Sequence, residues 1–451
     1  MADAVAGNEP AGNAADGVPR DQVSLLRRQV LVAVLLFLGY GAYYFCRADF
    51  AVGTPLLIDE LGRHGIGARE AHIRIGDINS YGVLAYALGK LFLTGLGDYW
   101  GGRRSFLLGL AGAGAFTVLF ASVGGLPLFT LAWIGNRLTQ SIGWAGLIKV
   151  SSRWFNYSSY GTVIGILSVS YLVGDATARQ SMGALISHGV GWRGVFLFAA
   201  GAAGALLLAN FLLLRESRVD AGYSEAVVSP RNVYAGQAGR PVGIVALLKP
   251  LLLNRAFILV CLLSFGCTIV RESFNAWTPT YLKEHVGFSA GLAASWSSVF
   301  PWAGAASVLI AGWVSDRLGA NGRSLILMLG LAAAAAALWL LAAAPAGQEH
   351  ATWALVLISV VALCLLGPYS YLGGAFALEF GGKEAGATSS GIIDGIGYLG
   401  GVLAGDVVAR IASTLGWHGV FIGLAGVSAA AAGAAAVLHA QQSRAMARSG
   451  G

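Results

Sequence analysis

The chain contains Arg47-Ala-Asp-Phe-Ala-Val-Gly-Thr-Pro55 and, 224 residues further on, Arg271-Glu-Ser-Phe-Asn-Ala-Trp-Thr-Pro279. Arg, Phe, Thr and Pro agree at the same spacing in both copies. Each copy places an arginine deep inside an apolar run, where a guanidinium costs about 2.5–3.5 kcal/mol even on mild membrane-insertion scales. Two such arginines at matching positions predict a chain of two related halves, each holding a buried charge that needs a partner or a wet cavity.

Composition places the chain in a membrane. Of its 451 residues 56% are hydrophobic and 11% charged, and the mean hydropathy is +0.68, whereas soluble domains carry about 25% charged residues. The net charge of +7 does not predict nucleic-acid binding, because the basic residues lie in short loops between apolar runs. The four cysteines have no CxxC or metal-like spacing, so we expect no disulfide, metal or cofactor.

Apolar runs of about 20 residues mark spanning helices. Six precede and six follow a polar connection: 29–60, 75–96, 105–123, 128–150, 161–186 and 194–214, then 255–282, 291–315, 324–343, 352–380, 386–411 and 420–438. The sequence therefore predicts an all-α membrane protein with twelve transmembrane helices. The predicted domains are a disordered tail 1–28, a six-helix bundle 29–215, a cytoplasmic linker 216–253, a second bundle 254–439 and a tail 440–451.

Basic residues set the predicted orientation. If both ends are cytoplasmic, the outer loops hold only Arg63, Arg69, Arg74, Arg193, Lys283 and Arg410. The inner loops and tails then hold about three times as many basic residues, as the positive-inside rule requires. We therefore expect a multi-pass protein of the plasma (inner) membrane with both termini in the cytoplasm.

Further repeats fix the relation between the halves. Gly191-Trp-Arg-Gly-Val-Phe196 recurs as Gly416-Trp-His-Gly-Val-Phe421, and Leu172-Val-Gly-Asp-Ala-Thr-Ala-Arg179 as Leu403-Ala-Gly-Asp-Val-Val-Ala-Arg410. Because each half has an even number of spans, the halves run the same way through the membrane. Parallel six-helix repeats of this kind form the major-facilitator fold, in which substrate binds between the pseudo-symmetric halves near the midplane.

Two predicted cytoplasmic loops resemble the loop signature of that superfamily. They are Gly97-Asp98-Tyr-Trp-Gly-Gly-Arg103-Arg104 and Gly312-Trp-Val-Ser-Asp316-Arg317. The resemblance implies a gating role for Asp98, Arg103, Asp316 and Arg317, in which an Asp caps a neighbouring helix and pairs with an Arg in one conformation. The first copy has Tyr99 where an Arg usually follows the Asp, which weakens its pairing.

The two repeated arginines predict an anion site. Arg47 and Arg271 fall at equivalent depths of the first and seventh helices, and a guanidinium fork matches phosphate or carboxylate oxygens. Asp49 and Glu272 lie two and one residues further along, so we expect their side chains to point elsewhere. The alternative is that each arginine is structural and binds backbone carbonyls or a buried acid.

Several stretches resemble the organophosphate:phosphate antiporters. They are Tyr40–Phe50, Trp277-Thr-Pro-Thr-Tyr-Leu-Lys-Glu284, Gly367-Pro368, Ala377-Leu-Glu379 and Gly397-Tyr-Leu-Gly-Gly401. The resemblance covers the chain from about Leu31 to about Phe421 and implies exchange of a phosphate ester for inorganic phosphate by rocker-switch alternating access. It also implies that Arg47 and Arg271 hold the phosphoryl group.

The same resemblance extends to other cavity residues. Lys90 matches a basic residue of the second helix that approaches the cavity; otherwise it is a snorkelling lysine, although it lies about 12 Å from the helix end at 1.5 Å per residue. Tyr43 and Tyr44 lie one turn before Arg47 and would either line the cavity or pack in the core, and Tyr398 is similar.

Departures from the family leave the substrate open. Ala48 stands where a second basic residue is common, and Tyr171 aligns with a histidine thought to contact substrate. Arg137, in Asn136-Arg-Leu-Thr-Gln140, would act in coupling or brace its helix. Asp394, one turn before Tyr398, is a candidate for proton coupling or for binding a substrate amine or hydroxyl.

Two further acids each precede an arginine by four residues. The Asp175–Arg179 and Asp406–Arg410 spacing predicts intrahelical ion pairs with a structural or gating role on the outer side. No nucleophile–base set or phosphate loop is present, so we do not expect an enzyme. The leading hypothesis is an organophosphate–phosphate exchanger that works as a monomer. The alternatives are a proton-coupled carboxylate symporter and a transporter-like sugar-phosphate sensor.

Overall fold

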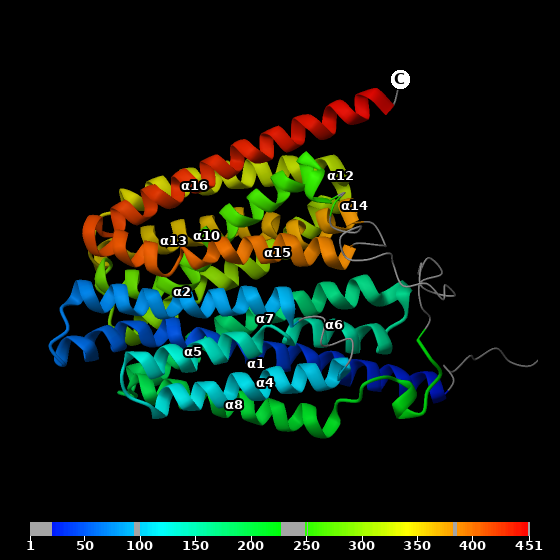
Figure 1. Cartoon of the computed structure of the whole chain (residues 1–451), viewed down its shortest axis with the longest axis horizontal. Helices are drawn as coiled ribbons and strands as arrows, with labels where there is room; N and C mark the ends of the chain where they lie inside the picture. The colour runs from blue at the N-terminus through cyan, green and yellow to red at the C-terminus, as the bar shows by residue number, and fades with distance from the viewer. Residues whose placement is uncertain (1–19, 94–99, 227–248, 250, 382–385, 450–451) are drawn as a thin grey trace, which may run out of the picture.

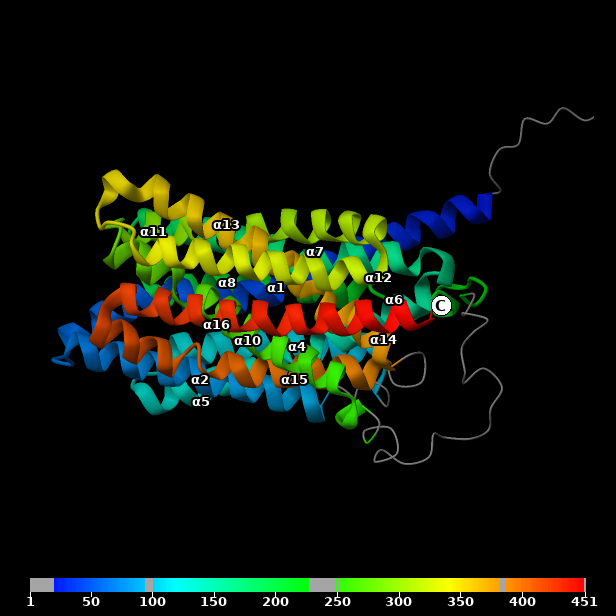
Figure 2. The same ribbon diagram turned by 90° about the horizontal axis from the view of Figure 1, so that it is seen from above.

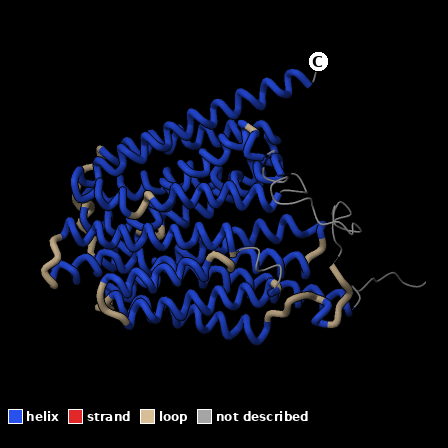
Figure 3. Tube along the Cα trace, in the orientation of Figure 1, coloured by secondary structure: helices blue, strands red, loops and turns tan. Residues whose placement is uncertain are grey.

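The computed structural model describes residues 20–93, 100–226, 249, 251–381 and 386–449. All regular secondary structure in this part of the chain is helical (Figure 3), so the predicted all-α class is confirmed. Eight of the described helical segments are long and apolar enough to cross a membrane. Other helices fall short of that measure; α5, for example, has only 15 residues.

The helices form two sets that follow each other in the chain. The first set consists of α1 (Arg20–Arg63), α2 (Ala68–Phe92), α4 (Gly102–Ser122), α5 (Leu126–Gln140), α6 (Gly143–Trp154), α7 (Tyr157–Ser187) and α8 (Trp192–Leu213). The second consists of α10 (Arg255–Glu284), α11 (Ala290–Trp296), α12 (Val299–Ala342), α13 (Ala351–Tyr371), α14 (Ala377–Gly381), α15 (Gly386–Val402) and α16 (Asp406–Ser449). Figure 1 shows the first set, blue to green, largely below the second, green to red.

The predicted spans differ from the helices in detail. The fourth span is divided into α5 and α6, and the tenth contains a π-helix, Leu372–Phe376, between α13 and α14. α12 covers the eighth and ninth spans, and α16 continues through a kink at Gly416. α1 begins at Arg20 and α16 extends to Ser449, so both helices reach into the segments predicted as tails.

The internal repeat is confirmed by a matching pair of contacts. In the first half the indole Nε1 of Trp192 donates to Glu60 Oε2 at 2.5 Å. In the second half the indole Nε1 of Trp417 donates to Glu284 Oε2 at 3.2 Å. These residues occupy equivalent positions of the repeat. In each half, therefore, the tryptophan at the start of the last helix bonds to a glutamate at the end of the first helix.

Glycines let the two halves approach closely at two equivalent crossings. A Cβ on Gly76 of α2 would lie 2.8 Å from the carbonyl oxygen of Gly405, just before α16. A Cβ on Gly183 of α7 would lie 2.7 Å from the carbonyl oxygen of Gly291 in α11. Such contacts leave no room for a side chain, and small residues of this kind are typical of close helix packing in membranes.

Both termini of the described chain lie at the same end of the molecule (Figures 1 and 2), which we call the inner end. At the opposite, outer end the halves are joined by polar contacts. Lys283 pairs with Asp59, and His72 Nε2 lies 2.8 Å from Glu284 Oε1. Together with the two glycine crossings, these contacts close the outer end in this conformation.

Candidate functional site

The helix that carries Arg47 is kinked immediately before it. Cys46 has φ −78° and ψ 17°, far from the helical ψ of about −42°. Its carbonyl accepts from Gln140 Nε2 at 2.9 Å, while the Phe50 amide that would normally bond there donates to Asp49 Oδ1 at 2.7 Å. Both groups that a regular helix would pair with each other are thus bonded to side chains, as is typical at a kink.

The kink presents Arg47 to the interface between the halves. Its Nε donates to Gln140 Oε1 at 3.3 Å, and its Nη1 donates to the Tyr44 hydroxyl at 3.1 Å. The guanidinium carbon lies 4.7 Å from the centre of the Tyr44 ring and 4.5 Å from that of Tyr86. Aromatic faces attract cations at such distances, so Arg47 is oriented by hydrogen bonds and rings together.

Arg271 approaches the same interface from the second half. It is buried, and its Nη2 donates to Glu272 Oε1 at 2.9 Å. Its guanidinium carbon lies 4.8 Å from the Tyr369 ring centre and 5.2 Å from that of Tyr398. The Tyr398 ring in turn lies 4.7 Å from the Tyr86 ring, centre to centre. The two repeated arginines therefore flank a pair of tyrosines, one from each half.

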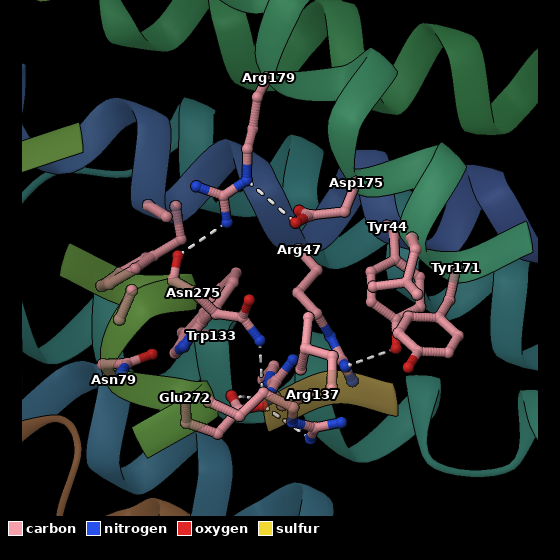
Figure 4. A pocket seen from close by; sticks show the side chains of 16 residues that line it. Tyr44, Arg47, Asn79, Trp133, Arg137, Tyr171, Asp175, Arg179, Glu272 and Asn275 are labelled. Atoms are coloured by element: carbon pink, nitrogen blue, oxygen red, sulfur yellow. Dashed lines mark hydrogen bonds and ion pairs between the residues drawn. The ribbon is translucent and has the colours of Figure 1, made fainter. Parts of the chain in front are cut away.

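Arg47 and Arg271 both line one pocket between the halves (Figure 4). Its charged lining residues are four arginines and two acids: Arg47, Arg137, Arg179, Arg271, Asp175 and Glu272. Four guanidinium and two carboxylate groups give the lining a net charge of +2. This positive charge favours an anion as the ligand.

Lys90 and Asp394 were predicted as separate site residues, and the structure brings them together. Lys90 Nζ lies 3.5 Å from Asp394 Oδ2, and this ion pair joins α2 of the first half to α15 of the second. Lys90 also faces the ring centres of Tyr86 and Tyr398 at 5.7 and 6.0 Å. It therefore points into the interface and does not snorkel.

The predicted tyrosines divide into two groups. Tyr44 and Tyr171 line the pocket, with ring centres 5.4 Å apart. Tyr43 is a correction: it is buried inside the first half, where its hydroxyl donates to the Phe106 carbonyl at 2.5 Å. Consecutive helical residues point in different directions, so only one of the pair Tyr43 and Tyr44 can face the pocket.

The expectation that Glu272 points away is wrong. Its carboxylate lines the pocket and contacts Arg271, and its Oε2 lies 3.8 Å from Arg137 Nη2. Its side chain is long enough to turn back beside its sequence neighbour. Asp49 behaves as expected, since its carboxylate faces away and accepts from Thr117 Oγ1 at 3.4 Å.

Arg137 does more than brace its own helix. It lines the pocket, contacts the opposite half through Glu272, and places its guanidinium carbon 4.9 Å from the Tyr86 ring centre. Tyr86 itself was missed, although it precedes Lys90 by one helical turn and so lies on the same face of α2. The four-residue spacing between Tyr86 and Lys90 could have identified Tyr86 from the sequence.

Both predicted intrahelical ion pairs are present. Arg179 Nε lies 3.0 Å from Asp175 Oδ2, and Arg410 Nε lies 2.6 Å from Asp406 Oδ1. Arg179 also crosses to the second half, where its Nη2 donates to the Asn275 carbonyl at 2.8 Å (Figure 4). This contact ties the outer side of the pocket across the interface.

The predicted gating residues are only partly visible. Arg103 donates to the carbonyls of Phe211 and Leu214 at 2.6 Å each, so it caps the C-terminal end of α8. The guanidinium of Arg317 lies over the Trp313 ring at 3.7 Å. Asp98 lies outside the described residues, as does the side chain of Asp316. The described residues hold no group of three or more metal-ligating side chains.

Comparison with known proteins identifies the family. The model of the Major Facilitator Superfamily matches residues 23–405. The chain belongs to this superfamily. Its fold is the predicted one, and membership of a transporter superfamily agrees with the prediction that the chain is not an enzyme. A crystal structure of the peptide transporter POT in complex with sulfate superposes with a TM-score of 0.71 at 14% identity, covering 91% of this chain and 94% of that one.

Sequence relatives are similar over most of the chain. A probable hexose phosphate transport protein of Chlamydia trachomatis is 26% identical over 86% of both chains. The glycerol-3-phosphate transporter of Bacillus subtilis is 26% identical over 88% of both. The membrane sensor protein UhpC of Escherichia coli is 27% identical over 89% of this chain and 90% of its own.

Proposed function

We propose that the protein is a secondary active transporter that carries an organic phosphate ester across the plasma membrane in exchange for inorganic phosphate. The observation that carries the proposal is the pocket between the halves, where one repeated arginine from each half faces a lining of net charge +2. A phosphate monoester has a second pKa near 6 and is largely a dianion at neutral pH. Its charge therefore matches that of the pocket.

The arginines suit a phosphoryl group in shape as well as in charge. Each guanidinium presents a planar fork of donors that pairs with two oxygens at once. Arg47 and Arg271 approach from opposite halves, so one phosphoryl group between them would be held by both. Relatives that carry hexose phosphate and glycerol-3-phosphate support a phosphate ester as the organic substrate.

Alternating access would follow from the way the halves meet. The outer end is closed by the glycine crossings and by the Lys283–Asp59 and His72–Glu284 contacts. Opening it requires these contacts to break while the inner parts of the halves approach. The basic loops support cytoplasmic termini, and the pocket lies within a single chain, so a monomer suffices.

Counterflow in proteoliposomes tests the proposal. Vesicles loaded with phosphate and holding the full chain should take up labelled glycerol-3-phosphate or glucose-6-phosphate, and vesicles without internal phosphate should not. Simple carboxylates tested in parallel address the symport alternative, for which a proton gradient should drive uptake without internal phosphate. Uptake of carboxylates alone would reject the phosphate-ester assignment.

A sensor is the second candidate, and the similarity to UhpC favours it. A sensor would bind the phosphate ester in the same pocket but turn over slowly. Binding of glucose-6-phosphate to the purified protein, measured beside uptake, separates the two. Saturable binding without counterflow would identify a sensor, and binding with counterflow a carrier.

A further inference from the structure

Arg137 and Glu272 form an ion pair between the halves inside the pocket. Arg137 belongs to α5 and Glu272 to α10, and both side chains are more than nine-tenths buried. The pair is long, at 3.8 Å between Arg137 Nη2 and Glu272 Oε2, because Oε1 of the same carboxylate already accepts from Arg271. The single Glu272 carboxylate thus contacts two guanidinium groups and does not fill all the hydrogen-bond donors of either one.

Several guanidinium donors at this point have no acceptor. Among the buried side-chain atoms of the described residues, Nε and Nη1 of Arg137 and Nε of Arg271 make no hydrogen bond. A buried, unpaired donor costs about 1–3 kcal/mol, and more when it is charged. Three such donors lining one pocket need acceptor oxygens that the protein itself does not supply, and an oxyanion would supply them.

Arg137 is close enough to act with the repeated arginines. Its guanidinium carbon lies 4.9 Å from the Tyr86 ring centre, and that of Arg47 lies 4.5 Å from the same centre. Arg271 shares Glu272 with Arg137. The three guanidinium groups all line the same pocket.

We propose that Arg137 is a third ligand for the substrate anion and that Glu272 is a built-in counter-ion which the anion displaces. This inference rests on the proposed function, since it concerns how the same pocket binds phosphate. In the empty protein Glu272 occupies part of the place of a substrate oxygen on Arg271 and Arg137. Incoming phosphate takes over these donors, and Glu272 returns when phosphate leaves.

A displaced counter-ion has a definite kinetic signature. Glu272 competes with the substrate, so it weakens binding and speeds release. Removing its charge would raise the net charge of the lining from +2 to +3 and leave more donors for the ligand. Affinity would rise while turnover falls, because release of the anion becomes slower. A pair that only braces the two halves would not change affinity in this direction.

Equilibrium binding of inorganic phosphate to the purified full-length protein tests the inference. Glu272→Gln should lower the dissociation constant of phosphate about tenfold and reduce the maximal exchange rate in proteoliposomes. Arg137→Gln should raise that constant about tenfold. When Arg137→Gln is already present, Glu272→Gln should change the dissociation constant of phosphate by a smaller factor, because the Arg137 guanidinium for which Glu272 competes with phosphate is absent. Glu60→Gln, which removes an ion-paired carboxylate outside the pocket, should leave the constant unchanged.

The outcomes separate this inference from the proposed function. If Glu272→Gln fails to fold, Glu272→Asp, which withdraws the carboxylate by one methylene, should lower the constant by a smaller factor. An unchanged or weaker affinity in the folded Glu272 variants, or a normal affinity in Arg137→Gln, overturns the counter-ion and leaves the transporter standing. Absence of phosphate binding and exchange in the wild-type protein would instead overturn the proposed function.

Discussion

Gln140→Leu should weaken anion binding without removing any charge from the pocket. Gln140 is buried, and its amide connects three groups: it donates to the Cys46 carbonyl and to Asn136 Oδ1, and it accepts from Arg47 Nε. Leucine fills a similar volume but makes none of these bonds. The substitution therefore removes the support of the kink and one of the two hydrogen bonds that orient Arg47.

The magnitude follows from the groups left without partners. The Cys46 carbonyl and Asn136 Oδ1 each lose a bond at 2.9 and 2.6 Å, and a buried acceptor without a donor costs about 1–3 kcal/mol. The folded protein should lose about 2–6 kcal/mol if both remain unsatisfied. Arg47 keeps only Tyr44 as a hydrogen-bonding partner among these contacts, and we expect the dissociation constant of phosphate to rise about tenfold, or 1.4 kcal/mol.

Binding of phosphate to the purified variant, together with its thermal unfolding, provides the assay. Thr139→Val is the matched control, because among the described residues the Thr139 hydroxyl bonds to carbonyls of its own helix, at Gly135 and Asn136. The control should keep wild-type affinity. If Gln140→Leu is folded and binds phosphate as tightly as the wild-type protein, the kink does not orient Arg47 for binding.

Three further predictions concern the ends of the molecule. Gly183→Leu places a side chain where the Gly291 carbonyl lies, so hydrogen exchange at the outer end should increase and transport should fall while phosphate still binds. His72 precedes the predicted span 75–96. Burial lowers the pKa of His72, but the contact with Glu284 raises it by more, so the net shift of the pKa is upward. The His72–Glu284 contact should stabilise closure of the outer end at low pH and weaken as the pH rises through the pKa of His72. Hydrogen exchange at the outer end should therefore increase with pH, and this increase should be smaller in His72→Asn. Arg103→Ala uncaps α8 and should lower the unfolding temperature while leaving phosphate affinity unchanged.

Much of the fold followed from two patterns in the sequence. Long apolar runs predicted the helices, and the matched arginine stretches predicted two parallel halves. The boundaries were less accurate, because apolarity does not report how far a helix extends beyond its apolar run, as α1 does back to Arg20. Interruptions inside the predicted spans were also missed: the division between α5 and α6 and the π-helix Leu372–Phe376 depend on tertiary packing rather than on hydropathy.

The pocket was predictable where symmetry constrained it. Arg47 and Arg271 could be paired because the repeat relates them. Glu272 was misjudged because helical spacing fixes the direction of a Cβ but not the reach of a long side chain. Tyr43 and Tyr44 could not be distinguished, since choosing between them requires knowing which face of α1 meets the second half. The Lys90–Asp394 ion pair joins residues 304 positions apart that the repeat does not relate.

Phosphate exchange by Arg47→Lys and Arg271→Lys tests the central claim most directly. Each variant keeps the positive charge but loses the planar fork that would hold two phosphoryl oxygens. In proteoliposomes loaded with phosphate, each should exchange labelled phosphate at least about tenfold more slowly than the wild-type protein. Arg74→Lys, an exposed arginine outside the pocket, should exchange at the wild-type rate. Wild-type exchange by both pocket variants would contradict the clamp between the halves.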